Sequence, residues 1–243
     1  MIFFSIPLFL TAQNESTIYY VGNMGVAIVK NDSVILIDAV HDFYGASYLP
    51  SDPEVLSKVW KKEKPFAKLI VVTATHIHGD HFDETMITSL SNVMRTAKTV
   101  VGKQLAEKLT GIHPENLLMI DRQGTVRLSN QLAITMKEVT HGPRNPDIEN
   151  YRIEITWGTE RFVHFGDAPG GNITFDGLKP GATVAIVPNW LCFDEKDISM
   201  LEAQQFKTII ATHIAPTASP TFGKCSIPII GFRKYGDQYV VKP

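Results

Sequence analysis

The sequence predicts an α/β protein whose functional groups gather at the ends of its strands. Short apolar runs rich in Val, Ile and Thr alternate with stretches of helical pattern, which indicates strands that alternate with helices. Open α/β sheets bind their ligands at strand ends, so one sheet edge could collect the residues on which these runs stop. Five runs stop on a residue that can bind a metal: Asp38, the cluster from His76 to His81, His141, Asp167 and His213.

The first strands are predicted to form a β-meander. Its apolar runs at 18–21, 26–29 and 34–37 are short and rich in Val and Ile, as strands are. The segments 22–25 and 31–32 separate these runs and carry Asn and Gly, which tolerate the positive φ of tight turns. We therefore expect three consecutive strands joined by hairpins.

A helix is predicted to follow this meander. Asp52 supplies a capping carboxylate, Pro53 fits the first turn, and Glu54 interacts favourably with the helix dipole. We expect the helix to run to about Lys62 and the next strand to occupy 69–73.

The remaining sequence predicts further helices and strands in alternation. Turns are expected at Gln123-Gly124 and Ser129-Asn130, and a late helix is expected to be capped by Asp197. The expected elements are a helix at 83–90, a strand at 100–101, a helix at 103–109, strands within 117–157, strands at 162–165 and 184–187, a helix at 197–205 and a strand at 208–212.

Two segments echo each other. Ala74-Thr75-His76 and Ala211-Thr212-His213 each follow an apolar run of the same shape. The echo suggests two halves of similar build, each of which delivers a histidine from a strand end.

Composition places the chain among ordinary globular proteins. The 243 residues suffice for one large domain, expected at 14–243, with a full hydrophobic core. The formal net charge of −2 gives no basic field, so a nucleic acid is not an expected partner and a small-molecule substrate is. No stretch is long and apolar enough to predict a transmembrane segment.

The first thirteen residues predict a signal peptide. They form an apolar stretch of about nine residues that ends in small and polar residues near Ala12, which is too short to span a bilayer. No basic residue precedes this stretch, and the alternative is an N-terminal strand. A cleaved signal would make the protein periplasmic or secreted, and otherwise it would be cytoplasmic.

The two cysteines do not predict a zinc site. Cys192 and Cys225 lie far apart in the sequence and neither has a CxxC partner. A disulfide and two separate thiols are both compatible with the sequence.

The cluster from His76 to His81 predicts a metal centre. His76 and His78 would point the same way in extended backbone and could share one metal. Gly79 would permit a bend that turns Asp80 and His81 toward a second metal. Four potential ligands in six positions would crowd a single tetrahedral ion, and a pair of ions relieves the crowding. Taken singly, three other histidines are expected to be ordinary surface or core residues: His41, His113 and His164.

Thr75-His76-x-His78-x-Asp80-His81 resembles the signature of the metallo-β-lactamase-fold hydrolases. Four more motifs of that superfamily have counterparts in order along nearly the whole chain: Gly22 to Gly25 with Leu36-Ile37-Asp38, Thr140-His141-Gly142, Tyr151 to Ile155 with Phe165-Gly166-Asp167, and Ala211-Thr212-His213. The resemblance implies a four-layer αβ/βα sandwich, in which two mixed β-sheets are flanked by helices.

The resemblance also implies a role for each motif residue. The first metal would be held by His76, His78 and His141, and the second by Asp80, His81 and His213. Asp167 would bridge both metals, and Asp38 would hydrogen-bond a ligand imidazole. Zinc is the expected ion, and iron or manganese accept the same ligand types. A zinc-bound hydroxide would attack a carbonyl carbon or a phosphorus, with Asp80 orienting it or shuttling a proton.

The expected activity is hydrolysis of a small ester, lactone or phosphodiester. The sequence resembles the lactonase and phosphodiesterase-like branch of the superfamily. Many β-lactam-cleaving members lack the bridging aspartate, so Asp167 argues against β-lactam hydrolysis as the activity. A di-iron redox protein and a non-catalytic metal-binding protein would carry the same ligands, and both remain open at this point. Substrate contacts are expected from loops over the strand ends, with His41, Arg144, Asn189 and Trp190 as candidates.

Overall fold

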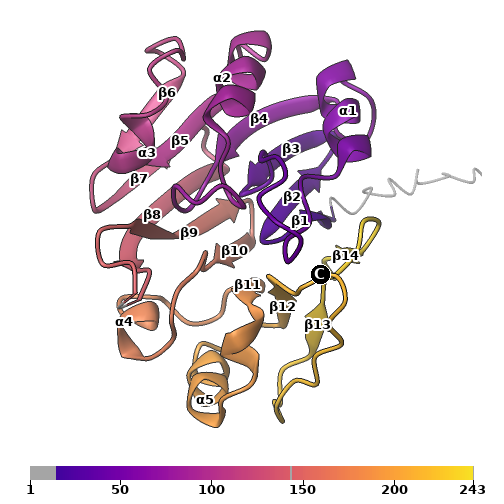
Figure 1. Ribbon diagram of the computed structural model, residues 1–243, viewed down its shortest axis with the longest axis vertical. Coiled ribbons are helices and arrows are strands. Elements are labelled where there is room, and N and C mark those ends of the chain that lie inside the picture. Colours follow the sequence, from indigo (N-terminus) through magenta and orange to yellow (C-terminus); the bar gives the residue numbers. More distant parts are fainter. Residues whose placement is uncertain (1–14, 143, 243) are drawn as a thin grey trace, which may run out of the picture.

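The protein folds into two mixed β-sheets of seven strands each, as the computed structural model shows for residues 15–142 and 144–242 (Figure 1). The first sheet has the order β14 (Gln238–Val240), β1 (Thr17–Gly22), β2 (Gly25–Lys30), β3 (Ser33–Ile37), β4 (Lys68–Thr73), β5 (Lys98–Gly102) and β6 (Leu117–Ile120). The second has the order β13 (Ile229–Gly231), β12 (Thr208–Thr212), β11 (Val184–Pro188), β10 (Glu160–His164), β9 (Glu149–Trp157), β8 (Leu132–Thr140) and β7 (Gln123–Arg127).

Helices cover the outer face of each sheet. Figure 1 shows α1 (Pro53–Lys61), α2 (Glu84–Val93) and α3 (Lys103–Ala106) beside the first sheet, and α4 (Asn172–Phe175) and α5 (Glu195–Ala203) beside the second. No helix in the described ranges is long and apolar enough to cross a membrane. The expected signal peptide at 1–13 lies outside the described residues and remains a prediction.

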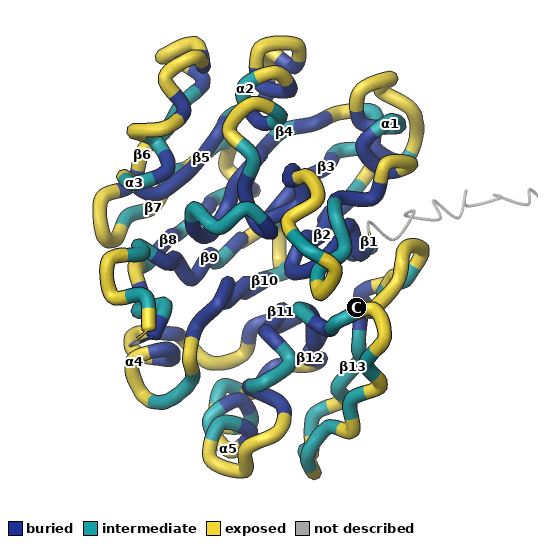
Figure 2. Tube along the Cα trace, in the orientation of Figure 1, coloured by how far each residue is buried: buried dark blue, intermediate teal, exposed yellow. Residues whose placement is uncertain are grey.

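Three apolar clusters hold these layers together. Side chains from both sheets, such as Ile35 and Ile153, form the middle cluster. The outer clusters join the first sheet to α1–α3 and the second to α4 and α5. Figure 2 shows that the central strands of both sheets are the most buried parts of the chain, whereas the edge strands β7, β13 and β14 are partly exposed. The expected four-layer αβ/βα sandwich is therefore confirmed, and burial on both faces explains why β11 and β12 are continuous apolar runs.

The helix starts follow local chemistry, with one correction. Asp52 caps α1 as expected, because its carboxylate accepts hydrogen bonds from the amides of Glu54 and Val55. The expected cap Asp197 of the late helix is wrong: Asp194 caps α5, and its carboxylate accepts from the amides of Lys196 and Asp197. The Asp197 side chain instead accepts a hydrogen bond from the Gly171 amide at 2.9 Å.

One expected turn is also displaced. Gln123-Gly124 begins β7, and the turn falls at Arg122, whose φ is +59°. The turn at Ser129 is confirmed, because its hydroxyl accepts hydrogen bonds from the amides of Gln131 and Leu132. Helix α3 ends at Ala106, short of the expected Leu109.

The two sheets have matching strand order. In each, three antiparallel strands (β1–β3 and β8–β10) are followed by three parallel ones (β4–β6 and β11–β13). The expected two halves of similar build are thus present. However, the echoing strands β4 and β12 hold different places in their halves, whereas β3 and β10, which precede Asp38 and Asp167, hold equivalent ones.

Candidate metal centre

The five candidate motifs converge where the two sheets face each other. Asp38 follows β3, and the segment from His76 to His81 follows β4, both in the first sheet. The second sheet contributes the other three residues, at the ends of β8, β10 and β12: His141, Asp167 and His213. The expectation that a single sheet edge could collect all the groups is therefore corrected, because both sheets supply donors.

The first group contains His76, His78, His141 and Asp167. The His76 Nε2 atom lies 3.1 Å from His78 Nδ1 and 3.3 Å from His141 Nε2. Asp167 Oδ2 lies 3.9 Å from His76 Nε2 and 3.6 Å from His141 Nε2.

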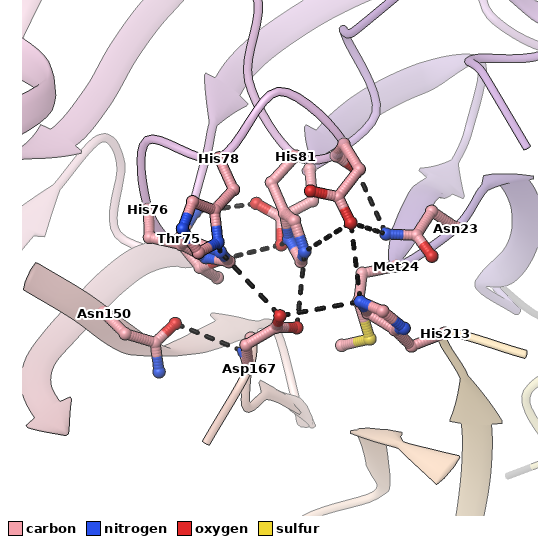
Figure 3. A network of polar contacts seen from close by, with 12 residues as sticks. Asn23, Met24, Thr75, His76, His78, His81, Asn150, Asp167 and His213 are labelled. Carbon is pink, nitrogen blue, oxygen red and sulfur yellow. Dashed lines mark hydrogen bonds and ion pairs between the residues drawn. The ribbon is translucent and has the colours of Figure 1, made fainter. Parts of the chain in front are cut away.

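The second group contains Asp80, His81 and His213. Asp80 Oδ2 lies 3.7 Å from His81 Nε2 and 3.5 Å from His213 Nε2. Asp167 also faces this group, because its Oδ1 lies 3.3 Å from His81 Nε2 and its Oδ2 lies 3.5 Å from His213 Nε2. Figure 3 shows the Asp167 carboxylate between the two groups.

These donors fit a pair of transition-metal ions. Zinc bonds of about 2.0–2.1 Å in a tetrahedron place neighbouring donors roughly 3.3 Å apart, and the ligand atoms within each group lie within 4.8 Å of one another. In the described part of the chain, the buried atoms His81 Nε2 and Asp167 Oδ1 face each other as an ion pair at 3.3 Å, but neither makes a hydrogen bond. Such atoms are costly to bury unless something binds them. The structure thus contains two His/Asp groups consistent with a dinuclear metal centre.

Asp38 fixes the ring orientation of two candidate ligand histidines, His81 and His76. It is completely buried, and its Oδ2 accepts hydrogen bonds from His81 Nδ1 and the Thr75 hydroxyl, each at 2.8 Å. The Thr75 hydroxyl in turn lies 3.0 Å from His76 Nδ1. Both imidazoles therefore carry a proton on Nδ1 and direct Nε2 toward the centre, which is the orientation that metal-bound histidines require.

The first group contains histidines that burial keeps neutral. Burial and the neighbouring imidazolium of His81 hold the pKa of His76 well below its usual range. Burial also lowers the pKa of His141, against the opposing effect of the Asp167 carboxylate.

The second group concentrates opposite charges. Burial would lower the pKa of His81, but the carboxylates of Asp167 and Asp38 outweigh it and raise this pKa well above its usual range. Burial would also lower the pKa of His213, and the Asp167 and Asp80 carboxylates outweigh it and raise this pKa to about 9. The same imidazoles overcome the burial of Asp167 and hold the pKa of its carboxyl well below the usual range.

The local backbone of the His cluster differs from the expected geometry. His76 lies in a bend at 75–77 and His78 follows this bend outside any strand, so the two do not share one strand, yet their rings still converge. Gly79 has no left-handed φ, and a Cβ atom there would lie 2.5 Å from the Tyr44 ring. A side chain at this position would displace the Tyr44 ring, which packs on this loop and is 54% exposed.

Sequence reasoning missed three positioning residues. Thr75 links His76 to Asp38, and the fully buried Asn150 accepts a hydrogen bond from the Asp167 amide through Oδ1 at 3.2 Å. Asn23 lies in the β1–β2 turn and donates to Asp80 Oδ2 at 2.8 Å. The one sequence signal for these roles is the Thr that precedes His in both Ala-Thr-His segments.

A cavity of about 610 Å³ opens beside the first group. It is lined by His141, Gly142, Arg144, Asn145, Asp167, Pro169 and Trp190. Two of the four candidate substrate contacts, Arg144 and Trp190, are among these residues. The Trp190 ring is fixed, because its Nε1 donates to the Ala168 carbonyl at 2.9 Å.

The other two candidate contacts do not line this cavity. Asn189 uses its side-chain amide to donate to the His213 carbonyl. His41 is only 1% exposed, and burial lowers its pKa.

The remaining histidines behave as expected of single residues. His164 is buried, and its Nε2 donates to the Met24 carbonyl at 3.0 Å. His113 is exposed and lies in a turn.

The cysteines lie outside both groups. Both are free thiols, and Cys192 is buried. Burial, and to a lesser extent the neighbouring Cys225, raise the pKa of Cys192 to about 12, which suits an inert core thiol.

The facing mixed sheets and the paired His/Asp groups at their strand ends define a metal-dependent hydrolase of the metallo-β-lactamase fold. Residues 33–219 match the sequence model of the beta-lactamase superfamily domain, so the chain belongs to this family. No curated protein matches the chain in sequence.

Solved structures share the fold at low sequence identity. Igni18, a metallo hydrolase from the archaeon Ignicoccus hospitalis, is 17% identical with a TM-score of 0.62, and the match covers 94% of this chain and 99% of that one. The metallo-beta-lactamase fold protein YhfI from Bacillus subtilis is 18% identical with a TM-score of 0.59, over 93% and 99% of the two chains. Zinc-bound PqqB from Methylobacterium extorquens is 10% identical with a TM-score of 0.51, over 78% and 76%.

Proposed function

We propose that the protein is a dinuclear zinc hydrolase that cleaves a small ester, lactone or phosphodiester. The observation that carries this proposal is the Asp167 carboxylate, which faces donors of both groups at 3.3–3.6 Å. Igni18 and zinc-bound PqqB, which share the fold, are respectively a metallo hydrolase and a zinc-containing protein, and both support this assignment.

The residues around the centre would have different roles: some would hold the metal ions, and others would orient the nucleophile or the ligand imidazoles. His76, His78 and His141 would hold one ion, Asp80, His81 and His213 the other, and Asp167 both. When bound, the ions lower the pKa of a coordinated water to about 7 and so supply a nucleophile at neutral pH. Asp80 faces the centre through Oδ2, where it can orient the nucleophile and hold its proton. Asp38 would keep the imidazole of His81 in the binding tautomer.

The presence of Asp167, which would contact both ions, separates this proposal from β-lactam hydrolysis. Many β-lactam-cleaving members of the superfamily carry a cysteine or a small residue where this chain has Asp167. The proposal of catalysis over passive metal binding is supported by all seven donor positions being filled and by the cavity beside them.

The cavity favours a substrate that carries an anionic group. Arg144 lines it, and no ion pair of a lysine or arginine in the described part of the chain involves Arg144. Arginine binds carboxylate and phosphate oxygens in a two-pronged geometry. Trp190 and Pro169 would face the apolar part of the same substrate.

A substrate panel tests the proposed activity. Chromogenic phosphodiesters, lactones and β-lactams are assayed with zinc-loaded protein and with protein treated with a chelator. We expect chelator-sensitive turnover of at least one ester, lactone or phosphodiester, and little turnover of β-lactams. Turnover of β-lactams alone, or no turnover of any class by protein that holds two metals, would contradict the proposal.

Replacing Arg144 tests the anionic substrate. Arg144→Ala should raise KM for an anionic substrate by roughly tenfold to a hundredfold, the cost of losing a hydrogen bond to a charged group, with kcat little changed. A neutral substrate with the same scissile bond should show no such increase. Arg127→Ala, at an exposed position at the end of β7, is the matched control. An equal rise in KM for both substrates would show that Arg144 does not bind the anionic group of the substrate.

A further inference from the structure

The β1–β2 turn reaches into the metal centre from the N-terminal hairpin. Asn23 in this turn is only 2% exposed and adopts a left-handed φ of +45°. Its side-chain Nδ2 donates to Asp80 Oδ2 at 2.8 Å and to the Asp80 carbonyl at 3.3 Å. Its backbone carbonyl accepts a hydrogen bond from the His213 amide at 3.0 Å. Figure 3 shows the Asn23 amide pointing toward this side of the site.

These contacts all reach the second group. Asp80 and His213 lie on different sheets, and Asn23 binds both. In the described parts of the chain, the hydrogen bonds of Asn23 do not reach His76, His78 or His141. The first group is held instead by other contacts, such as that of Thr75 with His76.

The side-chain amide of Asn23 also restrains Asp80 Oδ2, the candidate metal-binding oxygen of this carboxylate. Asp80 Oδ2, which accepts its hydrogen bond, is the atom that faces His81 and His213. A carboxylate oxygen has two lone pairs, so one can accept from Asn23 while the other points into the group. A buried hydrogen bond of this kind removes rotational freedom of the carboxylate before a metal binds, which strengthens binding.

We propose that Asn23 is a positioning residue that sets the affinity of the second metal position and leaves the first unaffected. The N-terminal hairpin then determines whether the centre holds one ion or two. This inference rests on the dinuclear centre proposed above.

Asn23→Gly is the sharpest test. Glycine adopts a φ of +45° without strain, so the turn is kept and only the amide is lost. Asn31→Gly is the matched control, because Asn31 is exposed, occupies the neighbouring β2–β3 turn and has a φ of +51°. Asn23→Ala lacks the same amide but is strained at this φ, so agreement between the two variants would tie an effect on zinc binding to the amide rather than to the turn. Circular dichroism and thermal melting check that both variants fold.

The measurement is a zinc titration of chelator-treated protein by calorimetry, with metal content checked by elemental analysis. We expect two zinc equivalents for the wild type and for Asn31→Gly. For Asn23→Gly we expect an unchanged first equivalent and a second weakened by roughly tenfold to a hundredfold, the usual effect of removing a residue that orients a ligand.

The possible results separate this inference from the proposed function. If the wild type binds two ions and Asn23→Gly weakens both equally, or neither, the role of Asn23 is refuted and the dinuclear centre stands. If the wild type does not bind two ions, the dinuclear centre and the role of Asn23 both fail.

Discussion

Asp38 shows how one buried side chain orients two candidate metal ligands. It follows β3, adopts a left-handed φ of +49° and is fully buried. Its carboxylate accepts from the Thr75 amide at 2.7 Å, from the Thr75 hydroxyl and from His81. A residue that is closed off from solvent therefore fixes the ring orientation of His81 directly and that of His76 through Thr75.

Replacing Asp38 should weaken metal binding without removing it. Asp38→Asn keeps the shape but converts one acceptor oxygen into a donor, so at least one of the three hydrogen bonds is lost. We expect metal affinity or activity to fall by about tenfold to a hundredfold, measured by zinc titration.

His78→Ala, which deletes a donor of the first group, should remove more metal and nearly all turnover. Wild-type rates in His78→Ala on a confirmed substrate would contradict the site assignment.

The two groups should differ in how their metal binding depends on pH. In the metal-free protein the pKa of His213 is raised to about 9 and that of His81 is raised well above its usual range, so both imidazoles are in the positively charged form at pH 7. His76 and His141 have lowered pKa values and are neutral. Binding at the second group must therefore release protons, and its affinity should rise about tenfold per pH unit for each proton displaced.

Calorimetric titrations in buffers of different ionisation enthalpy measure this proton release. We expect release to accompany the second zinc equivalent at pH 7 and to diminish as pH passes about 9. Equal release with both equivalents would contradict the assignment of charge to the second group.

At the scale of elements, the ends of strands contain both a packing contact between the two sheets and residues that position the candidate metal donors. Gly102 ends β5 of the first sheet, and Tyr151 in β9 of the second sheet packs against it. The same strand β9 carries Asn150, which holds the Asp167 amide. Close packing between the sheets therefore sets the distance across which the metal donors meet.

Adding a methyl group at this packing point should destabilise the protein. A Cβ atom at Gly102 would lie 2.0 Å from the Tyr151 ring, which is 1% exposed and has no room to move. Gly102→Ala should cost about 1–3 kcal/mol of unfolding free energy, measured by urea denaturation. Gly45→Ala is the control, because its Cβ would lie 4.0 Å from the nearest atom, so a change below about 0.5 kcal/mol is expected. Similar losses in both variants would argue against the clash.

For the whole molecule, a metal pair would join the two sheets. The first sheet supplies His76, His78, Asp80 and His81, and the second supplies His141, Asp167 and His213. Bound metal would therefore stabilise the packing of one half on the other, in addition to the apolar cluster between them.

Removing metal should lower the melting temperature. A metal present at a thousand times its Kd contributes about 4 kcal/mol, and each kcal/mol shifts Tm by about 2–4 °C in a domain of this size. Differential scanning calorimetry with and without chelator measures the shift. No shift for protein shown to contain two metals would contradict a centre built from both sheets.

This chelator effect should grow with pH. The raised pKa of His213 means that its charged form stabilises the metal-free fold fully below the ordinary value of 6.5, and that this stabilisation is lost as pH rises through about 9. The metal-bound fold needs neutral His213, so it does not depend on this stabilisation and does not weaken over the same pH range. The lowered pKa of Asp167 acts at the other end, because its stabilisation is present above the ordinary carboxyl value and is lost as pH falls.

The sequence alone predicted what depends on neighbours in the chain. Strands β1–β4, the cap Asp52 of α1 and the runs that end on donor residues follow from side-chain periodicity and capping chemistry, which act over a few positions. The cap of α5 was misplaced because two aspartates lie three positions apart, and only Asp194 has its carboxylate free for the helix amides. The five motifs also identified the family, because donor types and their order are local features.

Only the tertiary structure decided which residues hold the donors in place. Asn23 and Asp80 lie 57 positions apart, so no local pattern links them. The family resemblance did predict that Asp38 hydrogen-bonds one of the histidines, and this is confirmed, but the structure identifies the partner as His81, 43 positions away. A local pattern is likewise absent for the Tyr44 ring against Gly79 and for the cavity shared by Arg144 and Trp190. The physical reason is that periodicity fixes the side of a strand on which a group points, whereas the partner it meets depends on how two sheets pack.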